Sequence, residues 1–131
     1  MYHRKPGFRP HRKHETILQE HFAHWLDAKG ILFTASMAGV NLHPVVARLR
    51  KIMGCKPGTP DIMIFEPRGA YHGLFIELKS TEGDVKDPKQ LEWQRELTKR
   101  KYLAVMMPLG LDFADAFNWL RDLVEKYMTN T

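Results

Sequence analysis

The chain has 131 residues, of which 44% are hydrophobic and 27% charged, a balance typical of one globular domain with a single core. No apolar run reaches the ~18 residues that a membrane span requires, and no apolar stretch follows the charged N-terminus as in a signal peptide. We therefore expect a soluble, cytoplasmic protein that contacts no membrane. Cys55 is the only cysteine, which excludes an intrachain disulfide and a multi-cysteine zinc site.

The formal net charge of +5 comes from the N-terminus. Five basic residues precede the first acid, Glu15, and the rest of the chain carries 15 basic and 15 acidic residues. Residues 1–13 contain two prolines and a glycine and show no apolar periodicity. We therefore expect a flexible basic arm, followed by one domain over residues 14–131. The arm could bind phosphate or could simply aid solubility.

Hydrophobic periodicity, taken in chain order, first predicts a helix over residues 15–29 that ends at Gly30. A short run of strand formers follows at residues 31–36. Residues 41–54 return to helical spacing, with Asn41 as the expected N-cap of this second helix.

Two strands are predicted next, at residues 61–65 and 73–79, and the proline and glycine between them indicate an antiparallel turn. Both strands are apolar on alternate faces, which implies burial on both sides. A proline after Asp87 starts a third helix, in which Trp93 is interpreted as a core residue. A fourth strand and a last helix opened by Asp112 complete an α/β fold, with a four-stranded mixed sheet flanked by helices.

Three charged side chains lie at the ends of the central strands. Side chains two apart on a strand share a face, so Glu77 and Lys79 point the same way, and Asp61 begins the neighbouring strand. If the strands pair through the turn, the three groups meet. Burying unpaired charges is costly, so the cluster requires a cation or mutual pairing. Two carboxylates suit Mg²⁺ or Mn²⁺, and a salt bridge from Lys79 to a carboxylate is the alternative.

Basic residues also cluster on or beside the second and third predicted helices. Because an acidic metal pocket repels phosphate unless cations surround it, these clusters could line the path of a DNA backbone. A plain solvated face is the other interpretation. The candidates for DNA contact are Arg12, Lys13, Arg48, Lys51, Lys56, Arg95 and Lys99.

The sequence "GTPD", followed sixteen residues after its aspartate by "ELK", resembles the signature of the PD-(D/E)xK nucleases. Three longer segments are similar to the VRR-NUC branch of that superfamily, so the resemblance extends over most of the chain. They read "HETILQEHFAHWL", "ARLRKIMGCKPGTPD" and "DPKQLEWQREL". One departure is visible, because "ASMAGV" stands where many relatives have an Asn-Gly pair.

The resemblance implies a restriction-endonuclease-like core and a set of catalytic roles. Asp61 and Glu77 would bind Mg²⁺ or Mn²⁺ together with the backbone carbonyl of Leu78. Lys79 would orient or deprotonate the attacking water, and we favour orientation because lysine is ordinarily a poor base.

Three helical residues complete the implied site. Glu15 would add a carboxylate at the edge of the metal, and Gln19 lies one turn further on the same helical face. Gln90 would donate a hydrogen bond to the scissile phosphate or to the attacking water. Without the resemblance, all three would be interpreted as polar residues on helix surfaces.

Other chemistries have less support in the sequence. No HExxH motif or phosphate-binding glycine loop accompanies the histidines near the first helix, which are His14, His21 and His24. A nucleophile is equally poorly supported, because no partner pattern accompanies Ser36, Ser80 or Cys55.

Stand-alone VRR-NUC proteins are associated with homodimers that cut branched DNA such as Holliday junctions. The resemblance thus implies a metal-dependent, structure-selective DNA endonuclease that hydrolyses phosphodiester bonds, specifically a homodimeric junction resolvase of viral or phage type. Two alternatives stay open. One is a nuclease of the same chemistry that acts on flaps, ends or nicks, and the other is a nucleic-acid-binding module without catalysis.

Overall fold

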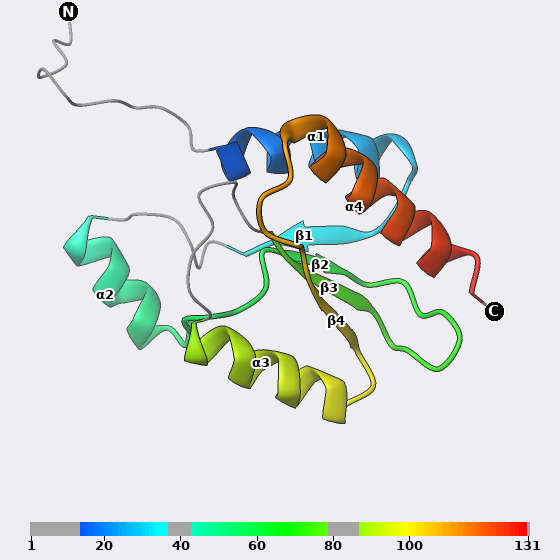
Figure 1. Cartoon of the computed structure of the whole chain (residues 1–131). Coiled ribbons are helices and arrows are strands. Elements are labelled where there is room, and N and C mark those ends of the chain that lie inside the picture. The colour runs from blue at the N-terminus through cyan, green and yellow to red at the C-terminus, as the bar shows by residue number, and fades with distance from the viewer. Residues whose placement is uncertain (1–13, 37–42, 79–86, 131) are drawn as a thin grey trace, which may run out of the picture.

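The computed structural model describes residues 14–36, 43–78 and 87–130. The expected basic arm at residues 1–13 and the residues 79–86 that follow the third strand lie outside this part. Eight elements follow one another in the predicted order (Figure 1). They are α1 (His14–Ala28), β1 (Phe33–Ala35), α2 (Pro44–Ile52), β2 (Ile62–Ile64), β3 (Leu74–Glu77), α3 (Pro88–Lys99), β4 (Leu103–Met106) and α4 (Phe113–Met128).

The four strands form one mixed sheet in the order β1-β2-β3-β4. β2 pairs antiparallel with both β1 and β3, and the predicted turn joins β2 to β3. β4 runs parallel to β3, because the chain crosses over through α3 between the two strands. The predicted α/β fold with a mixed four-stranded sheet is therefore confirmed.

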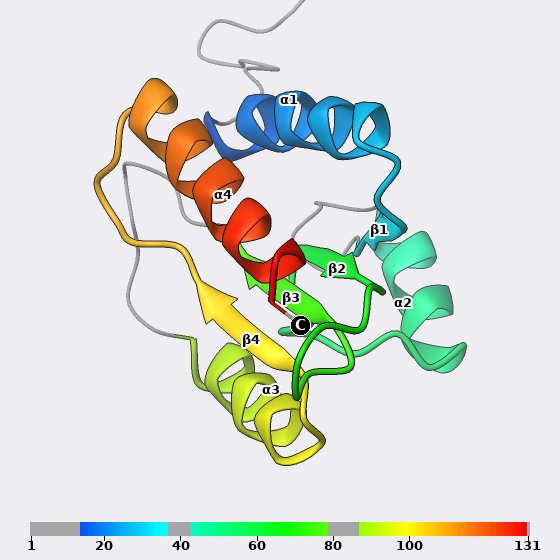
Figure 2. The ribbon, with the colours of Figure 1, turned by 90° about the vertical axis from the view of Figure 1, so that its right-hand side faces the viewer.

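Helices cover both faces of the sheet: α1 and α4 lie together on one face, and α3 lies on the other (Figures 1 and 2). The core forms between the sheet and the α1–α4 pair, because alternate strand residues point to this side and meet the apolar helical stripes. Its fully buried side chains include Leu18, Phe22, Leu26, Ile62, Ile64, Leu74, Ile76, Leu120 and Val124.

The opposite face of β3 points towards α3. Phe75 and Glu77 alternate with the core residues of this strand, and Phe75 packs against Tyr102 with ring centroids 5.0 Å apart. On α3, Gln94 donates a hydrogen bond to the backbone carbonyl of Ala104 in β4 at 3.4 Å. This arrangement places the acidic side chain of Glu77 between the sheet and α3.

α2 differs from the other helices because none of its residues is buried. His43 caps it, with Nδ1 accepting a hydrogen bond from the backbone N–H of Val45 at 3.2 Å. The expected cap, Asn41, lies outside the described residues. Apolar side chains that the helical spacing predicts along one face point to solvent, among them Leu49, which is 54% exposed. α2 projects beside the sheet in both views (Figures 1 and 2).

Trp93 is not the core residue that its sequence context predicts. It lies on α3, outside the core cluster, and its ring is only partly buried. Its indole N–H donates a hydrogen bond to the carbonyl of Pro57 at 3.1 Å, so the side chain connects α3 to the segment before β2. Trp25 and Trp119, by contrast, pack against the core.

Candidate active site

Asp61 and Glu77 lie across from each other at one end of the sheet. The antiparallel register pairs Ile62 with Ile76, so Asp61, one residue before β2, stands opposite Glu77, the last residue of β3. Residues directly opposite on antiparallel strands point to the same face. The carboxylate of Asp61 reaches the end of β3, where Oδ2 accepts a hydrogen bond from the backbone N–H of Leu78 at 2.8 Å.

The segment that carries Asp61 is held from two sides. Its backbone carbonyl accepts a hydrogen bond from the N–H of Ser36 at 2.9 Å, next to the edge strand β1. On the other side, Gly58 lies against the first turn of α3, where an added Cβ would stand 2.7 Å from the carbonyl carbon of Lys89. Gly58 also has φ of +83°, a conformation that favours glycine. Glycine therefore allows this loop to approach α3 closely.

Glu77 is a buried carboxylate, with 7% of its surface exposed. Its Oε1 accepts a hydrogen bond from the side-chain amide of Gln90 on α3. A carboxylate so far from water is stable only with hydrogen bonds or a nearby cation, because burial penalises the charged form. This end of the sheet is therefore suited to hold a positive ion.

The start of α3 places Gln90. Asp87 caps the helix, with Oδ1 accepting from the backbone N–H of Lys89 at 2.9 Å, and Pro88 occupies the first helical position. Gln90 then falls on the helical stripe that faces the sheet, together with Gln94. The predicted helix start is what brings the Gln90 amide to Glu77.

The structure brings together four of the predicted site residues: Asp61, Glu77, Leu78 and Gln90. Lys79 lies outside the described residues, and so does the side chain of Glu15 on α1. Gln19 is half-buried on α1.

The donors at this site fit a hard divalent metal. Mg²⁺ is typically held by one or two carboxylates, with water and substrate oxygens completing its shell, and the site offers two carboxylates beside the backbone of Leu78. Among the residues that the structure describes, no three His, Cys, Asp or Glu side chains gather as a metal site. His21 instead forms a T-shaped ring contact with Phe113, with centroids 5.2 Å apart.

The basic residues proposed for DNA contact lie in different surroundings. Arg48 and Lys51 are exposed on α2, and Arg95 is exposed on α3. Lys99 is paired with Glu96, with Nζ 3.0 Å from Oε2, so part of its charge is balanced. Lys56 lies in the loop before β2, whereas Arg12 and Lys13 fall outside the described part of the chain.

The loop before β2, residues 54–61, is named the Asp61 loop below. Sequence reasoning missed the contacts that hold this loop to α3. Gly58 and Trp93 both make such contacts, and neither was assigned to the site. The available signal was the spacing of Lys89 and Trp93, which puts both side chains on one stripe of α3, next to the stripe that carries Gln90.

The fold and this site together define a class of protein. A mixed sheet that joins an aspartate, a glutamate and a helical glutamine at one end is the restriction-endonuclease-like arrangement expected above. The model of the VRR-NUC domain matches residues 9–108, so the chain belongs to the VRR-NUC domain family. The predicted family is thus confirmed.

Solved structures agree with this assignment. One, titled "VRR_NUC domain protein", is 27% identical over 88% of each chain, with a TM-score of 0.66. A second, titled "VRR_NUC domain", is 23% identical over 88% of this chain and 99% of that one, with a TM-score of 0.56, and shows the shared fold. Comparison with curated proteins gives no match.

Membership in this family makes the chain a nuclease-like module with DNA as its substrate. The family generally uses divalent metal ions, which agrees with the donors at the end of the sheet. In the described ranges, no helix combines the length and the apolar character needed to cross a membrane.

Proposed function

We propose that the chain is a metal-dependent, structure-selective DNA endonuclease that hydrolyses phosphodiester bonds and resolves Holliday junctions as a homodimer. The observation that carries the proposal is the hydrogen bond from Leu78 N–H to Asp61, which holds this carboxylate at the end of the strand that bears Glu77. Two carboxylates at the ends of paired strands are a reasonable basis for metal-assisted hydrolysis.

Asp61, Glu77 and the carbonyl of Leu78 would hold Mg²⁺ or Mn²⁺. When bound, such an ion neutralises charge on the phosphate and lowers the pKa of a coordinated water. The hydrogen bond from Leu78 N–H fixes the orientation of the Asp61 carboxylate. The amide of Gln90, held by Glu77, lies at the same place and could donate to the phosphate.

Two predicted residues would complete the chemistry. Lys79, which lies two residues after Glu77 in the sequence, would orient the attacking water, as the family resemblance implies. Glu15 would add a carboxylate at the edge of the metal, with Gln19 one turn away on α1.

DNA would be held by its backbone. Exposed basic side chains on α2 and α3, including Arg48, Lys51 and Arg95, can neutralise phosphates. Lys56 lies in the loop that carries Asp61 and can do the same. Such contacts carry no sequence information, so the shape of the DNA would select the substrate. Binding should therefore weaken steeply as salt rises.

The exposed face of α2 supports the homodimer. An isolated helix of nine residues is marginal in water, and α2 buries none of its own residues. Its apolar side chains form one stripe, from which Arg48 and Lys51 are excluded by helical spacing. The stripe consists of Val45, Val46, Leu49, Ile52 and Met53, which are 67%, 42%, 54%, 72% and 74% exposed.

A two-fold contact between two α2 stripes would cover both. The same contact would leave the basic side of each helix open to DNA and present two active sites to a four-way junction. This geometry supports paired incision of a branched substrate.

The test is cleavage of a labelled four-way junction, a flap, a nicked duplex and a plain duplex with Mg²⁺ or Mn²⁺, with EDTA as control. We expect the junction to be cut fastest. The substitutions Asp61→Asn and Lys79→Ala should lower cleavage by orders of magnitude while DNA binding and the circular dichroism spectrum stay unchanged. Asp122→Asn, which changes an exposed carboxylate on α4, should cut as the unchanged protein does.

The other outcomes identify the alternatives. Faster cleavage of flaps or nicks would make the chain a nuclease of the same chemistry with a different substrate. Tight DNA binding without cleavage under any metal would make it a binding module.

A further inference from the structure

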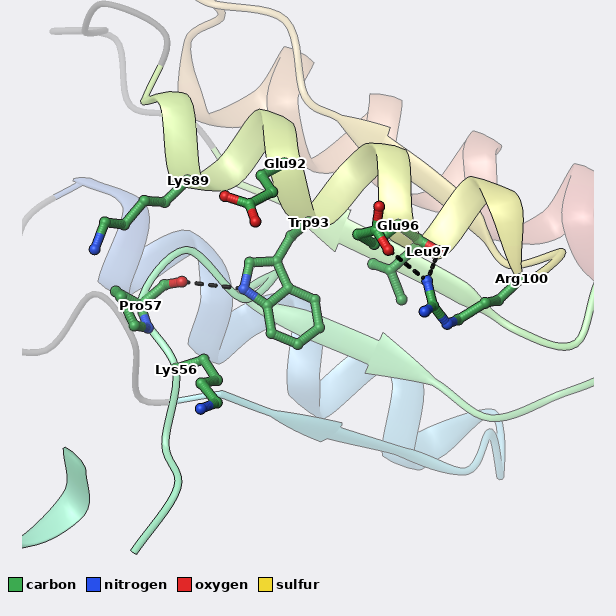
Figure 3. A pocket seen from close by; sticks show the side chains of 8 residues that line it. All are labelled: Lys56, Pro57, Lys89, Glu92, Trp93, Glu96, Leu97 and Arg100. Carbon is green, nitrogen blue, oxygen red and sulfur yellow. Dashed lines mark hydrogen bonds and ion pairs between the residues drawn. The ribbon is translucent and has the colours of Figure 1, made fainter. Parts of the chain in front are cut away.

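α3 and the segment before β2 line an open cavity of about 530 Å³ (Figure 3). Lys56 and Pro57 line it from the segment, and Lys89, Trp93, Glu96 and Arg100 line it from the helix. The helical residues recur at spacings of four, three and four, so they form one stripe along α3. A volume of this size lies within the range of small-ligand pockets.

This cavity lies next to the candidate active site, because the same two segments build both. On α3, Gln90 reaches the carboxylate of Glu77, and the neighbouring residue Lys89 lines the cavity. On the other segment, Pro57 lines the cavity and Asp61 follows four residues later. A ligand in the cavity would therefore contact the same two segments that carry Asp61 and Gln90.

Trp93 offers a fixed aromatic surface in this cavity. Its indole N–H is already satisfied by the carbonyl of Pro57 at 3.1 Å, which fixes the orientation of the ring (Figure 3). The ring is only partly buried, so an apolar aromatic face stays available. Nucleic acid bases stack on such faces whatever their sequence, because every base has a π-face.

The charges in the cavity lie on two sides of Trp93 (Figure 3). At one end lie Lys56 and Lys89 together with the carboxylate of Glu92, and neither lysine forms an ion pair within the described ranges. At the other end, Arg100 Nη1 lies 2.9 Å from Glu96 Oε1. The hydrogen bond from Arg100 lowers the pKa of Glu96, so this pair stays ionised and mutually neutralised.

Glu92 stands on the rim and is exposed. A site for a free phosphate alone would be uniformly basic, because a carboxylate repels an anion. A nucleotide fits this mixture of an aromatic ring, lysines and carboxylates better. Its base can stack on the tryptophan, and its phosphates can bind the two lysines.

We propose that this cavity takes an unpaired nucleotide of the DNA, with its base stacked on Trp93 and its flanking phosphates held by Lys56 and Lys89. The inference rests on the proposed function, because it makes the cavity a subsite beside the scissile phosphate. It also supplies a physical basis for structure selectivity. Intact duplex must first unstack a base, which costs a few kcal/mol, whereas branched or flapped DNA offers loose bases.

The test is binding in EDTA, where no cleavage occurs. A labelled eight-nucleotide single strand is titrated with the protein and followed by fluorescence anisotropy, with blunt duplex of the same length as the comparison. Trp93→Leu should lower the affinity for the single strand about tenfold, as expected for the loss of one stacked base, and should lower duplex affinity much less. Trp93→Phe should restore most of the affinity, because a smaller aromatic ring can still stack.

A second variant leaves the tryptophan in place. Lys56→Gln combined with Lys89→Gln should also weaken single-strand binding. In the unchanged protein the strand should quench tryptophan fluorescence, and this quenching should disappear in Trp93→Leu. Equal single-strand affinity in the unchanged protein, Trp93→Leu and the double lysine variant would overturn the proposal. So would full competition by inorganic phosphate at equal concentration, which would identify an anion site only.

The outcome separates this inference from the proposed nuclease activity. If the protein never cuts DNA but the loss of Trp93 abolishes the preference for single strands, the nucleotide subsite stands and the nuclease proposal fails. If the protein cuts junctions and Trp93→Leu binds single strands normally, only the subsite fails.

Discussion

At the scale of single residues, Gly58 decides how closely the Asp61 loop can approach α3. Gly58 and Gly54 both have positive φ, at +83° and +100°, so alanine at either position meets backbone strain of about 1 kcal/mol. Only at Gly58 would the added Cβ also meet the backbone of Lys89, at 2.7 Å, whereas no atom lies within 4 Å at Gly54. The two positions therefore form a matched pair.

We expect Gly58→Ala to lower the free energy of unfolding by roughly 1–3 kcal/mol more than Gly54→Ala does, because the loop must move away from α3. DNA cleavage should fall in Gly58→Ala alone, since Asp61 moves with the loop. Urea denaturation and a cleavage assay on the two variants measure both effects. Equal destabilisation in the two variants would show that the close approach to α3 contributes nothing.

The sequence predicted part of this residue-scale description. Asp61 and Glu77 could be placed together because strand alternation and pairing fix their directions. Gln90 was assigned only from the family resemblance, because its sequence context alone indicates a polar helix surface. Gly58 and Trp93 could not, because their roles depend on how a loop packs against a helix that begins about thirty residues later. Local periodicity contains no information about that approach.

At the scale of elements, α2 is exposed to solvent on the face that its sequence predicts to be buried. An apolar stripe at helical spacing ordinarily faces a core, and that of α2 faces solvent. Periodicity predicts that the helix exists but not what covers it. The order of all eight elements followed from periodicity, because the strands and the other helices pack in the usual way.

If α2 joins two copies of the chain, Leu49→Glu should convert the homodimer into monomers without lowering the stability of each monomer, because the side chain is exposed. Leu109→Glu is the matched control, since Leu109 is 52% exposed against 54% for Leu49 and lies outside α2. Sedimentation equilibrium measures the mass of both variants and of the unchanged protein. A dimer that persists in Leu49→Glu, or an unchanged protein that is already monomeric, contradicts the role of α2.

At the scale of the whole molecule, helices cover both faces of the sheet, with α1 and α4 on one face and α3 on the other. The α1–α4 layer supplies the core and so holds β2 and β3 in register. The α3 layer supplies Gln90 to the carboxylate of Glu77 and Trp93 to the neighbouring cavity. The α1–α4 layer therefore supplies most of the buried core, and the α3 layer supplies Gln90 and Trp93 on the opposite face of the sheet.

The central claim is that Asp61 and Glu77 together hold a divalent metal, and titration calorimetry with Mn²⁺ in the absence of DNA tests it most directly. The account predicts that the unchanged protein binds Mn²⁺ and that Asp61→Asn and Glu77→Gln each lose at least tenfold in affinity, because each removes a charged ligand. Asp122→Asn should bind as tightly as the unchanged protein. Undiminished Mn²⁺ binding in both Asp61→Asn and Glu77→Gln would contradict the account.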